Sequence, residues 1–286
     1  MTAGSALPAV WLGPGAITDP RALARFVDLV EVPLPVGPVT AGSRRARTGR
    51  TTVHGTGVGG VEHDDARGVS VAGATELLSW ASTRGLSACL AVRGSSPGDL
   101  AAVVAQVCRS VEGDAVSAVE VDLRGAAEQE VLRAMARVRE VAPRGVLLMA
   151  RLGALDPDLV ACARSAVAGG AHGVVVAGQV PLGGGRWWSG PSTAAVTRSG
   201  LRQLRQAATE QRWPGASLVA AGGVHDVATA RRAVADGASA VQLGTALWAD
   251  PTLLGPVLRA VHEARDSGSG PFAAPAPTPD DLWRPS

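Results

Sequence analysis

The stretch LVAAGGVHDVATARRAVADGASAVQLGTAL, residues 218–247, contains two short apolar runs on either side of a helical segment. The first run stops at Gly222-Gly223, Asp226 can cap the helix, and the second run stops at Gly244-Thr245. This order predicts a strand, a helix and a second strand. Both predicted strands end in glycine at the same edge of a sheet.

The glycines at these two strand ends favour an anion-binding site. Backbone N–H groups approach a ligand closely where no Cβ intervenes, and a helix start adds a favourable field. Tight turns also use glycine, and the chain contains 36 of them. Two glycine-ended strands in succession favour phosphate, because parallel barrels often bind it after their seventh and eighth strands. We therefore predict a phosphate site at Gly222, Gly223, Gly244 and Thr245.

The composition indicates a globular protein with a large core. The 286 residues are 46% hydrophobic, with a mean hydropathy of +0.17, and no apolar run is long enough to span a bilayer. The first residues lack the charged start of a secretory signal, so we expect a cytoplasmic protein with no membrane partner. Three cysteines in apolar stretches suit buried side chains and no metal site: Cys89, Cys108 and Cys162.

The charged residues narrow the classes of function. The chain contains no lysine and no tyrosine, so all 27 basic residues are arginine, and Schiff-base lysine chemistry is excluded. The formal net charge is +2, and the arginines are dispersed apart from a cluster within residues 44–50, so no nucleic-acid partner is expected. We expect a small-molecule substrate, and for assembly either a homodimer or a heteromer with a related subunit.

Strands and helices alternate along the chain. Apolar runs predict strands at residues 8–12, 28–32, 87–92, 117–122, 146–151, 173–177, 218–221 and 240–243. Helical spacing predicts helices at residues 20–27, 74–83, 96–111, 128–141, 156–168, 193–211 and 252–264, with one more inside the quoted stretch. Eight such repeats predict an α/β fold, a single (β/α)8 TIM barrel over residues 1–266. An open doubly wound sheet is the alternative, but no G-x-G-x-x-G follows an early strand.

Three segments depart from this repeat. Residues 33–71 form a long excursion after strand two, a loop with a hairpin near residues 51–54. Residues 178–190 are predicted as a loop after strand six. Residues 267–286 form a Pro- and Ala-rich tail that we predict to be extended or disordered.

Few strand ends carry a side chain that titrates. Asp122 and Arg151 end successive predicted strands, so they are expected to meet at the barrel mouth. An arginine beside Asp122 would keep its carboxyl ionised, which suits an anchor better than a proton donor. The pair is either a salt bridge that closes the barrel top or a contact for substrate or cofactor.

Other polar and aromatic residues leave their roles open. A run of histidines and aspartates in the long excursion is interpreted as a solvated loop, with a metal or general-base role as the alternative: His54, His63, Asp64 and Asp65. His225 either contacts phosphate or faces solvent, and His172 is predicted to be structural. Trp187-Trp188 either covers the cofactor site, packs against a partner subunit or blocks the site.

Three motifs point to one family: AAGGVHDVATA at strand seven, AVQLGTAL at strand eight and GGGRWWSGP after strand six. They resemble the class 1 dihydroorotate dehydrogenases and their relatives, FMN-dependent (β/α)8 barrels. Weaker similarity includes AVRGSSPGDLAAVVAQ and AVEVDL, so the resemblance spans almost the whole domain. It implies that an FMN phosphate is held by Gly222, Gly223, Gly244 and Thr245, near Gly184, Gly185, Ser189 and Gly190.

The chain departs from this family at the reactive residues. The family's Asn-Leu-Ser-Cys-Pro-Asn after strand four is residues 122–127, DLRGAA, so its substrate asparagine and cysteine base are absent. The lysine that ends strand five in the family is replaced by Arg151 in this chain, and the Asn-Thr that ends strand six is replaced by Gly178-Gln179. A further asparagine of the family is replaced by Val71. Without these amides the polar groups of orotate would stay unpaired, which opposes its binding.

The resemblance thus implies an FMN-dependent oxidoreductase that acts on a small non-orotate substrate, in biosynthesis or specialised metabolism. Asp122 and Arg151 are the candidate catalytic residues, because Arg151 would lie near the flavin ring. The alternative is a catalytically degenerate barrel, either a pseudoenzyme or a partner subunit, or a non-redox enzyme that binds a phosphorylated ligand.

Overall fold

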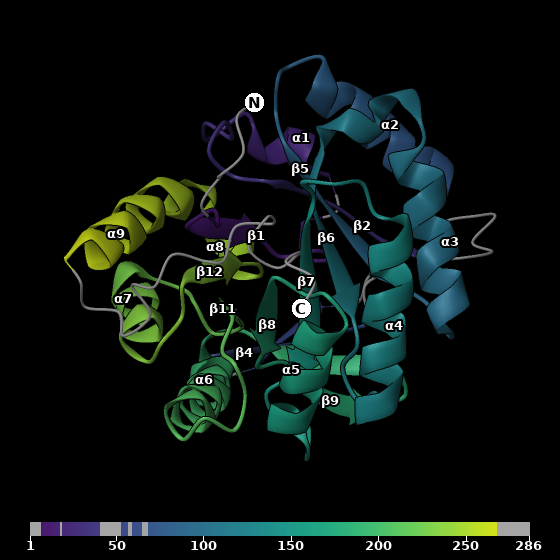
Figure 1. Ribbon diagram of the computed structural model, residues 1–286. Helices are drawn as coiled ribbons and strands as arrows, with labels where there is room; N and C mark the ends of the chain where they lie inside the picture. The colour runs from purple at the N-terminus through teal and green to yellow at the C-terminus, as the bar shows by residue number, and fades with distance from the viewer. Residues whose placement is uncertain (1–6, 18, 41–52, 57–58, 65–67, 268–286) are drawn as a thin grey trace.

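Eight parallel strands form the central sheet, and helices surround it (Figure 1). The computed structural model describes residues 7–17, 19–40, 53–56, 59–64 and 68–267. The strands pair in the order β1-β12-β11-β8-β7-β6-β5-β2. Their bounds are β1 Val10–Leu12, β2 Leu34–Thr40, β5 Ala88–Arg93, β6 Val116–Asp122, β7 Leu147–Gly153, β8 Gly173–Ala177, β11 Ser217–Ala221 and β12 Ala240–Leu243. The two end strands, β1 and β2, contact each other, so the sheet is a nearly closed barrel, and the predicted (β/α)8 fold is confirmed.

The helices alternate with these strands. Their bounds are α1 Pro20–Leu23, α2 Val71–Ser82, α3 Pro97–Cys108, α4 Glu128–Val141, α5 Leu159–Ala168, α6 Ala194–Thr209, α7 Val227–Ala235, α8 Ala246–Ala249 and α9 Leu254–Asp266. Ser96 caps α3 and Asp226 caps α7 through side-chain bonds to backbone N–H groups. Short 3-10 segments are η1 Val111–Ala115, η2 Pro191–Thr193 and η3 Pro251–Leu253. In the part of the chain that the structure describes, no helix has the length and apolar character needed to cross a membrane.

Two groups of apolar side chains make up the core. The larger group packs between the strands and the surrounding helices. The smaller group takes alternate residues of the barrel strands, which therefore face the barrel interior: Trp11, Cys89, Ala118, Met149, Val175, Val219, Ala221 and Ala240. Further along the same inward faces, toward the carboxyl ends, the residues become polar. This change from apolar to polar places the chemistry at that end of the barrel.

A second sheet joins the two excursions from the barrel repeat. It is antiparallel, with the order β3-β4-β10-β9. Its strands are β3 Val53–Thr56, β4 Gly60–Asp64, β9 Val180–Gly183 and β10 Arg186–Ser189. The predicted hairpin after strand two is therefore present. The predicted loop at residues 178–190 was wrong, because it forms a second hairpin that pairs with the first through β10 and β4.

The prediction for strand two was also wrong. Residues 28–32 form a turn, and the strand is Leu34–Thr40. This strand was not predicted because it contains prolines, and proline is rare in the interior of a strand. Here they are tolerated because β2 lies at the end of the pairing order and its register with β5 shifts between Val36 and Val39. Gly37 occupies this irregularity with φ +121, where a Cβ would collide with the carbonyl oxygen of Ala91.

The other predicted elements match within a few residues, and α4 and β8 match at both ends. The arginine cluster within residues 44–50 and the tail at residues 268–286 lie outside the described residues. Asp65 lies outside them as well, and the side chains of His54 and Asp64 are not described.

Candidate functional site

A cavity of about 410 Å³ lies at the carboxyl ends of the barrel strands. Residues that follow β1, β11 and β12 form one side of it, and the ends of β5, β6 and β7 form its floor. Strand β10 of the second sheet and helix α8 complete the wall. This volume lies within the range of small-molecule sites, and the position is where barrels of this kind bind ligands.

The cavity brings together most of the residues singled out from the sequence. Its lining includes Asp122, Arg151, Ser189, Gly190, Gly222, Gly223, Gly244 and Thr245. Gly184 and Gly185 are not part of the lining. They form the exposed turn between β9 and β10, with φ values of +59 and +78, so they serve the hairpin.

The glycine-ended strands β11 and β12 present backbone donors to the cavity. Within the described residues, the N–H groups of Gly222, Gly223, Gly244 and Thr245 donate to no backbone or side-chain acceptor. Buried or half-buried N–H groups seldom stay unpaired, so a ligand with several acceptors suits this position. We call these four residues the N–H cradle. An oxyanion such as phosphate is the ligand type that such donors favour.

Packing explains part of the same glycine pattern. A Cβ at Gly223 would overlap the backbone nitrogen of Ala194, at the start of α6, and Gly223 has φ +74. A Cβ at Gly244 would lie 3.2 Å from the Cβ of Ala16. Gly223 is therefore required by the fold as well, whereas a Cβ at Gly244 would only make a tight contact, and the unpaired N–H groups are the separate observation that points to a ligand.

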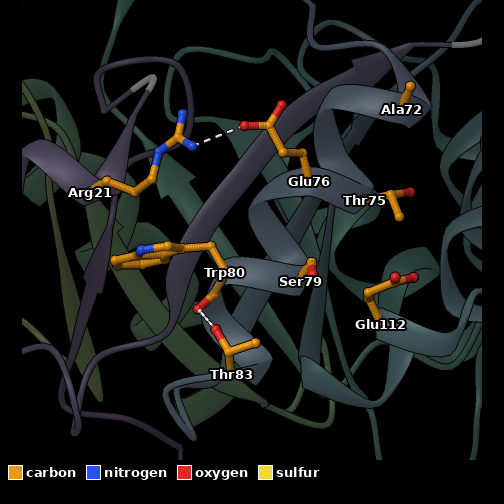
Figure 2. A pocket seen from close by; sticks show the side chains of 8 residues that line it. All are labelled: Arg21, Ala72, Thr75, Glu76, Ser79, Trp80, Thr83 and Glu112. Carbon is orange, nitrogen blue, oxygen red and sulfur yellow. Dashed lines mark hydrogen bonds and ion pairs between the residues drawn. The ribbon is translucent and has the colours of Figure 1, made fainter.

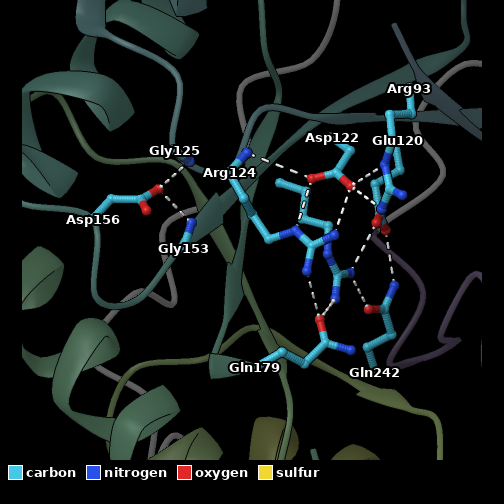
Figure 3. Close-up of polar contacts among 10 residues, drawn as sticks. Arg93, Glu120, Asp122, Arg124, Gly125, Gly153, Asp156, Gln179 and Gln242 are labelled. Atoms are coloured by element: carbon cyan, nitrogen blue, oxygen red, sulfur yellow. Dashed lines mark hydrogen bonds and ion pairs between the residues drawn. The ribbon is translucent and has the colours of Figure 1, made fainter. Parts of the chain in front are cut away.

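The floor of the cavity is a buried ion pair extended by two amides (Figure 3). Arg151 Nη1 lies 2.9 Å from Glu120 Oε1, and these side chains are 6% and 1% exposed. Arg151 also donates to Gln242 Oε1 at 2.7 Å and to Gln179 Oε1 at 2.6 Å. Gln242 in turn donates from Nε2 to Glu120 Oε2 at 2.8 Å. Both charges are thus neutralised and hydrogen-bonded, as buried charges must be.

Asp122 is held by two other arginines. Arg124 Nε and Nη2 donate to its two carboxylate oxygens at 2.8 and 2.7 Å, and Arg93 Nη2 donates to Oδ2 at 2.6 Å. Burial opposes ionisation of Asp122. The hydrogen bond from Arg124 and the charges of Arg124, Arg93 and Arg151 outweigh it and hold the pKa of the carboxyl well below its usual range. Asp122 therefore stays ionised, but its ion-pair partners are Arg93 and Arg124 instead of Arg151.

The second sheet supplies an aromatic and polar wall. The ring of Trp187 lies against the Arg124 guanidinium, 4.0 Å from Cζ to the ring centroid. His63 Nε2 lies 2.7 Å from Ser189 Oγ, and the His63 ring stands edge-on to Trp248 at 6.3 Å between centroids. All of these residues line the cavity, so the excursion after strand two contributes to the site. Trp187 thus forms part of the wall, while its neighbour Trp188 donates from Nε1 to Ser192.

The remaining histidines have distinct places. His225 lines the cavity next to the N–H cradle, and its Nδ1 lies 2.7 Å from the carbonyl oxygen of Gly223. His172 accepts a hydrogen bond from the Leu148 N–H at Nδ1, and burial lowers its pKa, so it is a neutral structural residue. Among the described residues no group of three or more metal-ligating side chains comes together.

Sequence reasoning gave no role to five floor residues: Arg93, Glu120, Arg124, Gln179 and Gln242. A signal for some of them was present. Inward-facing residues repeat with period two, so once Asp122 is placed at the mouth, Glu120 must face the interior one layer below. Gln242 follows in the same way from its place in β12. Arg124 and Gln179 lie beyond their strands, where no such periodicity applies.

A second hollow lies outside the barrel, along helix α2 (Figure 2). It encloses about 510 Å³ and is lined by one face of α2 together with Arg21 and Glu112. Arg21 Nη1 pairs with Glu76 at 2.9 Å, and Arg84 lies over the Trp80 ring. The hollow is away from the strand ends, and in the part of the chain that the structure describes none of its lining side chains is a buried polar group without a hydrogen-bond partner.

Comparison with solved structures identifies the fold. Two structures of dihydroorotate dehydrogenase from Eimeria tenella superpose on the chain. One is a complex with ferulenol, at 13% identity and a TM-score of 0.66, covering 91% of this chain and 82% of that one. The other is ligand-free, at 14% identity and a TM-score of 0.71, covering 92% and 85%. The chain has the dihydroorotate dehydrogenase fold.

At the level of sequence the relationship is distant. No protein-family model matches the chain, and no curated protein matches it either. The dihydroorotate dehydrogenase fold is therefore shown by structure, and the chemistry has to be argued from the residues of the cavity.

Proposed function

We propose that the protein is an FMN-dependent oxidoreductase that acts on a small substrate other than orotate. The observation that carries this proposal is the N–H cradle: Gly222, Gly223, Gly244 and Thr245 line the cavity with four unpaired backbone donors. They follow the seventh and eighth barrel strands, which is where phosphate sites often occur in such barrels. The likeness to dihydroorotate dehydrogenase structures supports the oxidoreductase class.

The residues of the cavity fit FMN at both ends. Backbone N–H groups suit the phosphate, because each donates a charge-assisted hydrogen bond and none carries a charge that must be desolvated. At the floor, the guanidinium of Arg151 supplies a fixed positive charge, and Gln179 supplies an amide for the polar edge of a flavin ring. When bound, FMN would supply the group that accepts a hydride from the substrate.

The protein's own side chains then divide the remaining tasks. Arg151 is held in place by three partners, so its charge stays fixed while negative charge develops nearby. Asp122 keeps Arg93 and Arg124 in position and, being ionised, does not donate a proton. Two histidines, His63 and His225, are among the described lining residues, and imidazole is the side chain best suited to proton transfer near neutral pH; His63 Nε2 lies 2.7 Å from Ser189 Oγ.

A different substrate from orotate follows from what lines the cavity. Cys89 is buried inside the barrel, where burial and the charge of Glu120 raise the pKa of its thiol, so it is no base for substrate. Neither of the other two cysteines lines the cavity. Asp122, Gly178 and Val71 stand where the resembling family has asparagines that bind orotate's polar groups.

The second candidate function is a non-redox barrel, either a partner subunit or a protein that binds a phosphorylated ligand. One observation favours it. The charged side chains of the floor already pair with one another, so the network is stable without any ligand. A phosphate in the N–H cradle is common to both functions.

The visible absorbance spectrum of the purified protein separates the two. The oxidoreductase proposal predicts that the protein keeps its flavin bands through gel filtration and releases the flavin on denaturation. If the purified protein is colourless, it should instead carry flavin bands after incubation with FMN and removal of the free FMN by gel filtration. A protein that stays colourless after incubation with FMN would remove the oxidoreductase proposal. Retention of FMN without reduction by any substrate class tested would favour the second candidate.

A further inference from the structure

The side-chain amide of Gln179 has a fixed orientation in the cavity. Its Oε1 accepts hydrogen bonds from Arg151 Nη2 at 2.6 Å and from Arg124 Nη1 at 3.2 Å. A guanidinium can donate hydrogen bonds but cannot accept them. The oxygen of the amide must therefore face the two arginines, and the nitrogen must face away from them.

This orientation leaves the two N–H groups of Gln179 Nε2 available. Within the described residues, Nε2 donates to no acceptor, although Gln179 lines the cavity and is partly buried (Figure 3). Gln242, the other amide of the floor, provides the contrast. Its oxygen accepts from Arg151 and its nitrogen donates to Glu120, so both of its ends are used inside the network. Gln179 is the amide that still needs a partner.

The arginines of the floor indicate which partner suits this amide. Arg93 and Arg124 share Asp122, and Arg151 pairs with Glu120, so the Gln179 amide lies beside a network of fixed charges. The two arginines that hold Gln179 also polarise its amide, which makes the N–H groups better donors.

We propose that Gln179 Nε2 is the ligand-anchoring donor of this cavity, and that it binds an oxygen edge that carries or gains negative charge. Two sources offer this chemistry: the carboxylate of a small-molecule substrate, or the pyrimidine carbonyl edge of a flavin. The flavin source rests on the function proposed above. The carboxylate source does not.

The variant Gln179→Glu tests this assignment with almost no change of shape. A carboxylate at residue 179 still accepts hydrogen bonds from Arg124 and Arg151, so the floor stays intact and thermal stability is expected to match the wild type. The variant removes the two donors. Gln179→Met removes the donors without adding a charge, and it decides the question if Gln179→Glu fails to fold. Gln129→Glu is the matched control, since Gln129 also accepts from an arginine, Arg133, but lies exposed on α4.

Binding is measured by calorimetry on the protein freed of any endogenous ligand, with FMN and with acetate, pyruvate and benzoate as probes. Loss of a hydrogen bond to a charged carboxylate weakens binding by at least about tenfold, and loss of one to the neutral carbonyl edge of oxidised FMN weakens it by about two- to tenfold. We expect Gln179→Glu and Gln179→Met to show this loss for one probe class, and Gln129→Glu to show none. A loss confined to FMN identifies the flavin edge, and a loss confined to the monocarboxylates identifies the substrate.

The proposal is overturned if both Gln179 variants bind every probe as tightly as the wild type, or if the wild type binds none of the probes. Its failure is distinct from failure of the oxidoreductase proposal. If the wild type does not bind FMN, but binds a monocarboxylate through Gln179, then the oxidoreductase proposal fails and the role of Gln179 stands.

Discussion

Replacing Arg151 by methionine should lower the free energy of unfolding by about 3–5 kcal/mol, because it removes the counter-charge of a carboxylate inside the barrel. Glu120 is 1% exposed, and its ion pair with Arg151 spans 2.9 Å. Arg151 also donates to Gln242 and Gln179 at 2.7 and 2.6 Å. Methionine fills similar space but donates nothing, so among the described residues Glu120 keeps only Gln242 Nε2, at 2.8 Å, as a side-chain donor.

Urea unfolding followed by far-UV circular dichroism measures the loss, with the midpoint and slope compared at neutral pH. The double variant Arg151→Met/Glu120→Gln should recover at least about 1 kcal/mol, since a neutral amide at residue 120 needs no counter-charge. Arg137→Met is the control. Arg137 and Glu140 lie 2.6 Å apart but are 60% and 57% exposed, so breaking that pair should change stability by less than about 1 kcal/mol.

Two results would refute this reasoning. If Arg151→Met were no more harmful than Arg137→Met, burial would not govern the strength of the pair. If Glu120→Gln gave no recovery in the double variant, the loss would come from packing and not from the isolated carboxylate.

Two further predictions concern Asp122 and the glycines. Because the folded-state pKa of Asp122 is lowered, its ionised form stabilises the protein above the unfolded-state value of about 3.9, and this contribution is lost as pH falls through the lower folded value. The difference in melting temperature between wild type and Asp122→Asn should therefore shrink from pH 7 to pH 3, and a constant difference would contradict the ionised state. Gly223→Ala should destabilise the protein by more than about 2 kcal/mol, since a Cβ there overlaps Ala194 at φ +74, whereas Gly184→Ala, at φ +59 in open space, should cost about 1 kcal/mol. Equal losses in urea unfolding would count against this difference.

The barrel could be predicted from sequence because its strands obey one local rule. Apolar runs such as Leu218 to Ala221 end at glycines, and helices with capping residues separate them. Strand β2 was not predicted because its two prolines are acceptable only at the end of the pairing order, a property of tertiary structure that no local pattern reveals. The hairpin at residues 180–189 was not predicted, because its second strand, β10, pairs with β4, which lies more than a hundred residues away in the sequence.

The site was predicted only in part, because some of its features are visible in the local sequence and others depend on the tertiary structure. The N–H cradle could be found because glycine at a strand end is a backbone signal that is visible locally. Asp122 and Arg151 were correctly placed at the mouth, but their partners were not, because ion pairing depends on which side chains of neighbouring strands reach one another. The position of His63 at the cavity could not be predicted from the sequence, because only the pairing of β4 with β10 in the second sheet places it beside Ser189.

The most direct test of the N–H cradle is a comparison of FMN with riboflavin, which lacks the phosphate. Both are titrated into the ligand-free protein, with quenching of flavin fluorescence as the measure of binding. If Gly222, Gly223, Gly244 and Thr245 hold the phosphate, FMN should bind at least about a hundredfold more tightly than riboflavin, since several charge-assisted hydrogen bonds are at stake. Equal affinities for the two flavins, or no binding of either, would contradict the account.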